Sequence, residues 1–330
     1  MSSVYHIEVS DDEDNQRLDR FLQKHLKGTP FGLLQKLMRS GQIRVDSKRV
    51  KASTRLVAGQ SVRIPPMDPA KRDQHQKKIS ARDAEFIKSL VIYDDGYLIA
   101  LNKPAGLATQ GGTGITRHID GMLEVLSNEE GVKPRLVHRL DKDTSGVLLL
   151  ARSSQMARDM GKIFQGRDVK KIYWALCVPA PEINNGEIKA PIRKAGAPGQ
   201  EKMIVDPEEG QRASTLFDVV ERAHKQVAFV AFWPRTGRTH QIRVHAAHMG
   251  TPILCDGKYG GKNAFIEGLD VKERVHLHAR SIRFTHPKTK KLVEIDAPLA
   301  DDIKKSWKAL GFDPNSDYIP FGDVKKSKKK

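Results

Sequence analysis

Strand and helix patterns alternate irregularly after residue 89, and this order limits the possible folds more than any other feature of the sequence. Residues 90–93 and 97–101 are apolar runs separated by Asp94-Asp95-Gly96, which is typical of a hairpin. Further strand patterns cover residues 146–151, 171–178, 227–233 and 280–285, and helical patterns cover 155–164 and 239–249. Because no regular strand–helix–strand repeat appears, the sequence predicts an α+β domain rather than a doubly wound sheet.

A second, smaller domain is predicted at the N-terminus. Apolar side chains recur at helical spacing over residues 18–26 and 33–38, and alternating patterns at 43–45 and 61–64 predict two short strands. We expect an N-terminal extension over residues 1–15, a small α/β domain over 16–66, a proline-containing linker over 67–88, a large domain over 89–313 and a basic tail over 314–330.

The charge of the chain indicates a polyanionic partner. The 57 Lys and Arg outnumber the 40 Asp and Glu, and the formal net charge is +17, which suits either nucleic acid or an anionic membrane surface. Residues 31–72 hold ten Lys or Arg and two acidic residues, a composition that suits phosphate contacts, although a merely solvated basic surface is the alternative. The longest apolar stretch, residues 227–233, is far too short to span a membrane, and no signal segment opens the chain. We therefore expect a cytoplasmic protein without a membrane partner.

No cofactor is expected from the composition or motifs. Cys177 and Cys255 lack partners at metal-ligand spacing, and no cluster of ligand residues accompanies His138 or His240. The glycines of residues 111–114 are not followed by the Gly-Lys-Ser/Thr of a phosphate loop. The sequence therefore predicts neither a metal nor a nucleotide cofactor.

The most informative segment is HRLDKDTSG at residues 138–146, which is followed at once by the apolar run VLLL. Charged side chains in a turn before a buried strand can project into a cleft from a rigid support. Taken alone, the segment could also be a loop held by carboxylate-to-backbone hydrogen bonds.

This segment resembles the catalytic motif of the RluA-type pseudouridine synthase family, in which its first aspartate, Asp141 here, is the catalytic residue. Three further segments follow the family's order: LNKPAG at 101–106, KIYWA at 171–175 and RTGRTHQIRVH at 235–245. The LHA at residues 277–279 also fits, so the resemblance covers roughly residues 90–300. It implies a catalytic domain built on a mixed, largely antiparallel sheet with flanking helices.

The resemblance also implies roles for individual side chains. Arg243 is the motif arginine expected to pair with Asp141 and keep it ionised, with a phosphate contact as the alternative. Tyr173 matches the tyrosine that stacks on the uracil ring, although an aromatic side chain on a strand could also belong to the core. Arg139 is expected to fill the gap left by a flipped-out nucleotide, and His138 and Leu277 are expected to bind substrate.

The N-terminal region resembles an S4 RNA-binding domain, whose first helix opens with RLDRFL at residues 17–22. This resemblance implies an RNA-binding surface in the small domain. The expected contacts are made by Arg17, Lys36, Arg39 and Arg44.

The implied reaction is the isomerisation of uridines in 23S ribosomal RNA, catalysed by a monomer. The carboxylate would either attack the nucleoside covalently or remove a sugar proton, and the sequence leaves both routes open. Asp143 is expected to form turn hydrogen bonds with Thr144 and Ser145 rather than to share the chemistry. Two other functions are also considered: a non-catalytic ribosome-assembly factor with the same fold, and a metal-dependent RNA hydrolase that uses both aspartates as ligands.

Overall fold

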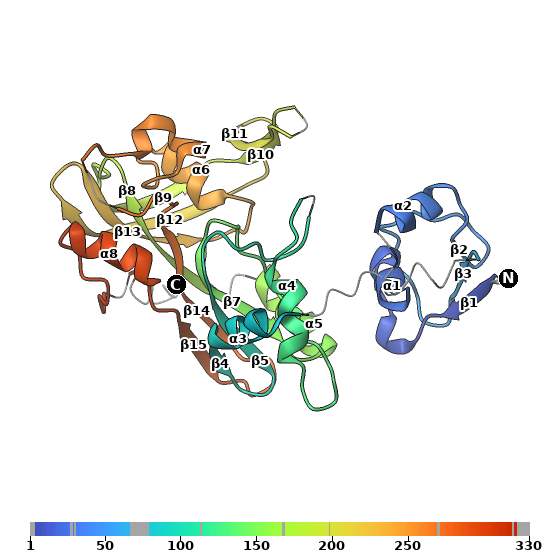
Figure 1. The fold of residues 1–330 in the computed structure, drawn as a ribbon. Helices are drawn as coiled ribbons and strands as arrows, with labels where there is room; N and C mark the ends of the chain where they lie inside the picture. The colour runs from blue at the N-terminus through green and yellow to red at the C-terminus, as the bar shows by residue number, and fades with distance from the viewer. Residues whose placement is uncertain are drawn as a thin grey trace, which may run out of the picture. The chain divides into compact units, whose positions relative to one another are not determined.

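The computed structural model describes residues 4–26, 29, 31–66, 79–112, 114–166, 169–197, 199–268, 271–318 and 320–321. Internal contacts divide the chain into two compact units, Met1–Ser80 and Ala81–Lys330 (Figure 1). Each unit has its own hydrophobic core and is described by itself.

The small unit packs two helices on a three-stranded antiparallel sheet with the order β1-β3-β2. Its elements are β1 (Tyr5–Glu8), the 3-10 helix η1 (Asp11–Glu13), α1 (Leu18–His25), α2 (Phe31–Arg39), β2 (Arg44–Val45) and β3 (Ser61–Ile64). Leu18, Phe21 and Leu22 lie on one face of α1 and are fully buried, because spacings of three and four residues bring side chains to the same side of a helix. Both helices that the apolar spacing predicted are therefore present.

The start of the small unit differs from the sequence-based prediction. We predicted an extension over residues 1–15, but Tyr5–Glu8 pairs with β3 and completes the sheet. The strand has only four residues, and its side chains are half-buried or exposed rather than fully buried. A short edge strand of this kind leaves a weak pattern in the sequence.

The large unit contains the remaining elements. They are α3 (Ala81–Ser89), β4 (Val91–Asp94), β5 (Leu98–Lys103), α4 (Ile119–Met122), η4 (Leu123–Leu126), β6 (Arg135–Leu136), β7 (Ser145–Ala151), α5 (Ser154–Gln165), β8 (Lys170–Cys177), β9 (Asn185–Lys189), β10 (Ile192–Ala195), β11 (Lys202–Val205), β12 (Ser214–Ala223), β13 (Val227–Pro234), α6 (Gln241–His248), α7 (Gly257–Gly260), η5 (Gly261–Ala264), β14 (Leu277–Thr285), β15 (Leu292–Asp296) and α8 (Asp301–Ala309).

A ten-stranded sheet organises this unit. Its main path runs β4-β5-β7-β14-β8-β13-β12-β9, with β15 beside β14 and β6 beside β7. Among the described strands, β7 and β14 form the one parallel pair of this sheet, and its other pairs are antiparallel. The prediction of an α+β fold on a mixed, largely antiparallel sheet is confirmed.

Helices cover both faces of the sheet, which explains why β7 is buried at every position (Figure 1). Leu148 and Leu150 face a cluster that includes Ile87 of α3 and Ile119 of α4. Leu149 faces the opposite cluster, with Met156 and Met160 of α5. Because side chains alternate between faces along a strand, only an unbroken apolar run can serve two cores at once.

The boundary between the two units also differs from the prediction. The large unit begins at Ala81, whereas the expected linker extended to residue 88. Ala81–Ser89 forms α3, and its Ile87 is buried in the large unit. Most of the predicted linker, residues 67–78, and most of the predicted tail, residues 322–330, lie outside the described residues. Within the described part of the chain, no helix is long and apolar enough to cross a bilayer.

Candidate active site

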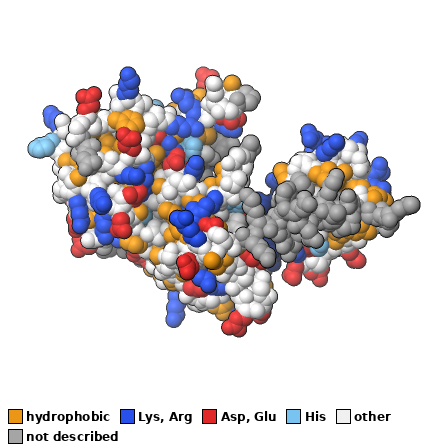
Figure 2. All heavy atoms as spheres, viewed as in Figure 1, with side chains coloured by type: hydrophobic (Ala, Val, Ile, Leu, Met, Phe, Trp, Pro, Cys, Tyr) orange, Lys and Arg blue, Asp and Glu red, His pale blue; other side chains and the backbone are white. Residues whose placement is uncertain are grey.

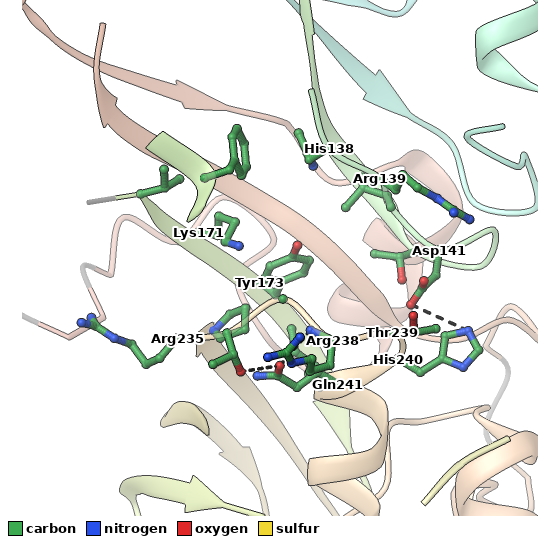
Figure 3. Close-up of a pocket in the computed structure, with 18 of the residues that line it drawn as sticks. His138, Arg139, Asp141, Lys171, Tyr173, Arg235, Arg238, Thr239, His240 and Gln241 are labelled. Carbon is green, nitrogen blue, oxygen red and sulfur yellow. Dashed lines mark hydrogen bonds and ion pairs between the residues drawn. The ribbon is translucent and has the colours of Figure 1, made fainter. Parts of the chain in front are cut away.

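A cavity of about 780 Å³ lies among the 138–146 turn, β8, β14 and the start of α6 (Figure 3). Its size falls within the range of small-molecule sites. The structure brings together in its lining all six predicted catalytic and substrate-binding residues: His138, Arg139, Asp141, Tyr173, Arg243 and Leu277. These residues come from four segments of the chain, so the fold forms a single site from motifs that are far apart in the sequence.

Asp141 projects toward the loop that precedes α6. Its Oδ2 lies 3.9 Å from Nε2 of His240, and about a third of its side chain is exposed (32%). Figure 3 shows the carboxylate and the imidazole pointing toward each other. Asp141 is therefore a partly desolvated carboxylate that a bound nucleotide could reach.

The turn that carries Asp141 is fixed by residues of the 101–109 segment. The Thr109 hydroxyl donates to the carbonyl of Leu140 at 2.7 Å and accepts the Leu140 N–H at 3.3 Å. The carbonyl of Lys142 accepts the Gly106 N–H at 2.8 Å. The segment LNKPAG and the residues that follow it thus hold the peptide groups on either side of Asp141.

Lys103 lies beneath the same turn and is fully buried. Its Nζ donates to the carbonyls of Pro104, Leu107 and Lys142 at 2.8, 2.8 and 3.2 Å, which matches the three N–H bonds of an ammonium group. Burial lowers the pKa of Lys103 to about 7, while the charge of Asp141 opposes this change. This buried cation therefore connects two loops and sits close to the proposed catalytic carboxylate.

A second anchor lies at the end of the turn. The Ser145 hydroxyl lies 2.9 Å from Nδ1 of His278, whose Nε2 donates to the carbonyl of Ala297 at 3.1 Å. Burial lowers the pKa of His278 to about 3, so the ring is neutral and Nδ1 accepts from Ser145. The turn is consequently tied to β14 as well as to the 101–109 segment.

Arg243 does not have the partner that the resemblance implied. It forms two hydrogen bonds of 2.7 Å with Asp256, and both side chains are buried. Its Nη1 lies 3.6 Å from Asp143, and no direct ion pair with Asp141 is found among the described residues. The prediction of an Arg243–Asp141 pair is therefore wrong for this structure. Two guanidinium nitrogens of Arg243 are bonded instead to Asp256, which is not part of the cavity lining.

Asp143 also differs from expectation. We predicted turn hydrogen bonds to Thr144 and Ser145, but in the structure Asp143 faces Arg243. The Thr144 N–H donates instead to the backbone carbonyl of Asp141 at 3.1 Å. The two aspartates of the motif therefore have separate surroundings and do not form a carboxylate pair.

Tyr173 forms part of the cavity wall between Lys171 and the loop before α6 (Figure 3). It is half-buried and also packs against two of the hydrophobic clusters, so the two interpretations of this residue are compatible. Burial raises its pKa, and the charge of Asp141 adds to the increase. The ring is consequently a neutral phenol with one part available to a ligand.

His138 supports the wall by a specific contact. Its Nε2 accepts the Leu149 N–H at 2.9 Å, and its ring stacks on Phe164 at 4.9 Å. Burial lowers its pKa to about 3, so the imidazole is neutral.

Arg139 is exposed, and Figure 3 shows its side chain directed away from Tyr173. Leu277 is buried at the start of β14, and substrate binding by these three residues stays a prediction.

Several basic residues of the lining were not assigned a role from the sequence. Lys171, Arg235 and Arg238 line the cavity together with Asp141, the one acidic side chain of its lining. The sequence did contain a signal for these residues, because all three lie inside the motif segments.

Two residues outside the cavity lining, Asp256 and Tyr259, lie in no segment used for the resemblance. Among the described residues, no three His, Cys, Asp or Glu side chains gather as a metal site.

The small unit presents three of its four predicted RNA contacts at the surface of α2 and β2. Lys36, Arg39 and Arg44 are exposed, and Figure 2 shows Lys and Arg side chains gathered over α2. Arg17 lies at the start of α1 and pairs with Asp19 at 2.6 Å, so its charge is partly balanced within the unit.

Comparisons with known proteins extend the similarity beyond the motifs. A sequence model of the family described as RNA pseudouridylate synthase matches residues 97–248. Ribosomal large subunit pseudouridine synthase C of Escherichia coli O157:H7 is 35% identical over 311 residues, covering 93% of this chain and 97% of the relative. The protein of that name from Buchnera aphidicola subsp. Baizongia pistaciae is 36% identical over 317 residues, covering 94% and 98%.

A solved structure agrees with these sequence matches. Human RNA pseudouridylate synthase domain containing 4 is 28% identical, with a TM-score of 0.59, covering 70% of this chain and 97% of that chain. The family match includes the turn with Asp141, strand β8 and all of α6, which are segments that contribute to the cavity. The resemblance inferred from the motifs is thus confirmed over the region that matters for chemistry, and the chain belongs to the RNA pseudouridylate synthase family.

Proposed function

We propose that this pseudouridine synthase isomerises specific uridines of the large-subunit ribosomal RNA, 23S in a bacterial ribosome, with Asp141 as the catalytic carboxylate. The observation that carries the proposal is the position of Asp141 as the one acidic side chain in a cavity lining that holds several Lys and Arg side chains. Nucleic acid carries a phosphate at every nucleotide, so such a lining suits an RNA substrate. The names of the bacterial relatives support the ribosomal large subunit as its source.

The reaction breaks the N1–C1′ bond, turns the released uracil, joins C5 to C1′, removes the proton from C5 and leaves a proton on N1. Atoms and electrons balance without an oxidant or a transferred group. Asp141 either adds to the nucleoside covalently or removes a sugar proton. The Tyr173 ring covers one face of the uracil, and the guanidinium of Arg243 contributes positive charge near the carboxylate.

RNA recognition extends beyond the cavity in this proposal. Arg139 fills the gap that the extruded nucleotide leaves in the RNA, a place suited to a planar guanidinium. The small unit acts as an S4-type domain and contacts phosphates through Lys36, Arg39 and Arg44. The protein works as a monomer in the cytoplasm and needs no cofactor.

The test compares Asp141→Asn with Asp143→Asn. Both variants remove one negative charge from the same turn, but only the first removes the proposed catalytic group. We expect Asp141→Asn to lower turnover at least about a thousandfold, with RNA affinity nearly unchanged. Release of tritium from 23S ribosomal RNA labelled at uridine C5 measures turnover, because the reaction expels that hydrogen.

Substantial turnover by Asp141→Asn would refute the catalytic assignment. Mapping pseudouridines in ribosomal RNA from cells that lack the protein tests the substrate separately. An unchanged large-subunit map would instead favour the non-catalytic assembly role or a different RNA. Activity that survives a strong chelator eliminates the metal-dependent hydrolase.

A further inference from the structure

A chain of polar contacts leads from the β10–β11 hairpin to Asp141. The Met203 N–H of β11 donates to the Tyr259 hydroxyl oxygen at 3.3 Å. That oxygen lies 2.6 Å from Nδ1 of His240, and Nε2 of the same ring lies 3.9 Å from Asp141. Tyr259 is absent from the cavity lining, so any effect it has on the reaction passes through the lining residues that it contacts, His240 by its hydroxyl and Arg243 by its ring.

The direction of these contacts fixes the hydrogen positions. A backbone N–H only donates, so the Tyr259 oxygen accepts from Met203 and its own hydrogen is free to point toward Nδ1 of His240. Burial lowers the pKa of His240, against the opposing charge of Asp141, so the neutral ring is favoured. A neutral ring whose Nδ1 accepts carries its hydrogen on Nε2, which is the nitrogen that faces the carboxylate.

Other packed elements hold His240 in place. Its backbone is left-handed, with φ 53° and ψ 19°, a conformation that is unfavourable for a residue with a side chain. The Val244 N–H bonds to its carbonyl at 3.0 Å, and its ring meets Tyr259 edge-on at 5.6 Å. An unfavourable conformation persists only where the surroundings determine it strongly.

Asp141, in contrast, is loosely held at its side chain. In the part of the chain that the structure describes, its carboxylate accepts no hydrogen bond, and His240 provides its one ion-pair contact within 4.0 Å. A carboxylate free to rotate would spend less time in the reactive orientation. A fixed N–H opposite one oxygen limits that rotation.

We propose that Tyr259 and His240 are positioning residues for the isomerisation. Tyr259 holds His240 in the tautomer with hydrogen on Nε2, and His240 orients the Asp141 carboxylate toward the nucleotide. This inference rests on the proposed function of Asp141. The charged groups that act on His240 are Asp141 from the motif turn, Arg243 from α6, Asp256 from the loop before α7 and Lys258 from α7.

Tyr259→Phe tests the proposal, because it removes the hydroxyl and keeps the ring packed beside Arg243. Near about pH 8 we expect turnover to fall roughly tenfold with unchanged RNA affinity, since the hydrogen can then move to Nδ1. As the pH falls through the pKa of His240, which burial holds below 6.5, the ring gains hydrogen on both nitrogens, so the deficit should shrink to about threefold or less. A purely structural defect would not show this dependence on pH.

Tyr318→Phe is the matched control, since its hydroxyl bonds to Asp218 at 2.8 Å and the residue is not part of the cavity lining. A second comparison uses His240→Gln, whose amide N–H reaches toward the position of Nε2, and His240→Leu, which has no donor. The glutamine variant should retain at least about fivefold more turnover than the leucine variant.

Wild-type turnover in Tyr259→Phe, a deficit that stays the same as His240 titrates, or equal losses in the two His240 variants would each overturn the proposal. Asp141→Asn is assayed in the same series. If that variant is inactive and Tyr259→Phe matches the wild type, only the positioning role fails. If Asp141→Asn is active, the proposed function itself fails.

Discussion

The guanidinium of Arg243 shows how a single buried contact supports the site. Arg243 and Asp256 are 3% and 0% exposed, and two hydrogen bonds of 2.7 Å align the carboxylate with the arginine fork. A charge taken out of water needs such a partner, and the loss of one member leaves the other uncompensated. The pair therefore fixes Arg243 before any RNA is bound.

Asp256→Leu should lower the free energy of unfolding by about 3–5 kcal/mol, because Arg243 then remains buried without its carboxylate. Urea unfolding followed by tryptophan fluorescence measures this, since all three tryptophans lie in the large unit. The double variant with Arg243→Met should recover part of the loss. Additive losses in the double variant would contradict the buried-pair argument.

Glu13 gives the small unit a testable dependence on pH. Burial raises its pKa, but hydrogen bonds from Lys24 and His25 dominate and lower it from 4.5 to about 2. A carboxylate with a lowered pKa stabilises the folded state above pH 4.5 and loses this contribution as the pH falls toward about 2. After allowance for the half-exposed Lys24, the contribution is about 1–2 kcal/mol.

Hydrogen exchange of the β1 and β3 amides should therefore show protection that weakens in this acidic range in the wild type. Glu13→Gln serves as the control, because it lacks the titrating group. After correction for intrinsic exchange rates, the same pH dependence in both proteins would rule out Glu13 as the cause.

At the scale of single residues, the sequence predicted side chains that line the cavity but not Asp256 and Tyr259, which hold lining residues in place. Asp141, Tyr173 and Arg243 lie in segments with strong motif signals, and the fold brings them to one wall. Asp256 contacts Arg243 and Tyr259 contacts His240, and both contacts exist only in the folded chain. Nothing in their local sequence distinguishes them from other polar residues in loops.

At the scale of elements, the contact between β7 and β14 sets the position of the turn that carries Asp141. Gly146 has φ +110°, and a Cβ at this position would lie 2.2 Å from the carbonyl oxygen of Ala279. The two strands approach closely only because the side chain is absent. Asp141 precedes this contact by five residues, so the strand pair anchors the turn that carries it.

Gly146→Ala should destabilise the large unit by at least about 3 kcal/mol, because the backbone is strained and the two strands must separate. Urea unfolding monitored by tryptophan fluorescence reports the change. Gly161→Ala in α5 is the control: a Cβ there meets nothing within 4 Å, and alanine should stabilise the helix by about 0.5–1 kcal/mol. Equal stability of the two variants would contradict the close-approach argument.

Most of the central strands were predictable, and the reason is their burial on both faces. β5, β7, β8 and β13 are almost continuously apolar, which gives a strong signal even without alternation. We did not predict β9, β12 or β15, because their residues include many polar or half-buried positions. Their pairing depends on partners distant in the chain rather than on local pattern.

At the scale of the whole molecule, two folded units with separate cores occur in one basic chain. If the small unit contacts phosphates, its charges should govern the salt dependence of RNA binding, because each lost contact reduces counterion release. The exposed side chains of Lys36, Arg39 and Arg44 provide a defined set for such a test.

The triple variant Lys36→Gln, Arg39→Gln and Arg44→Gln should bind ribosomal RNA more weakly. The slope of log affinity against log salt should fall by about 2 to 3. Filter binding over a salt series measures both quantities in the full-length protein. The control replaces three exposed lysines near β15, Lys288, Lys290 and Lys291, by glutamine. Equal slopes in the two variants would contradict a specific role for the surface formed by Lys36, Arg39 and Arg44.

The bracing of the turn around Asp141 determines which partner can move during the reaction. Leu140 and Lys142 are bonded to residues 31 and 39 positions earlier in the chain. A peptide segment restrained on both sides cannot swing to follow a migrating sugar carbon. Under the proposed function, the backbone of this turn therefore keeps its place, and the detached uracil rotates against it until C5 replaces N1 opposite the ribose.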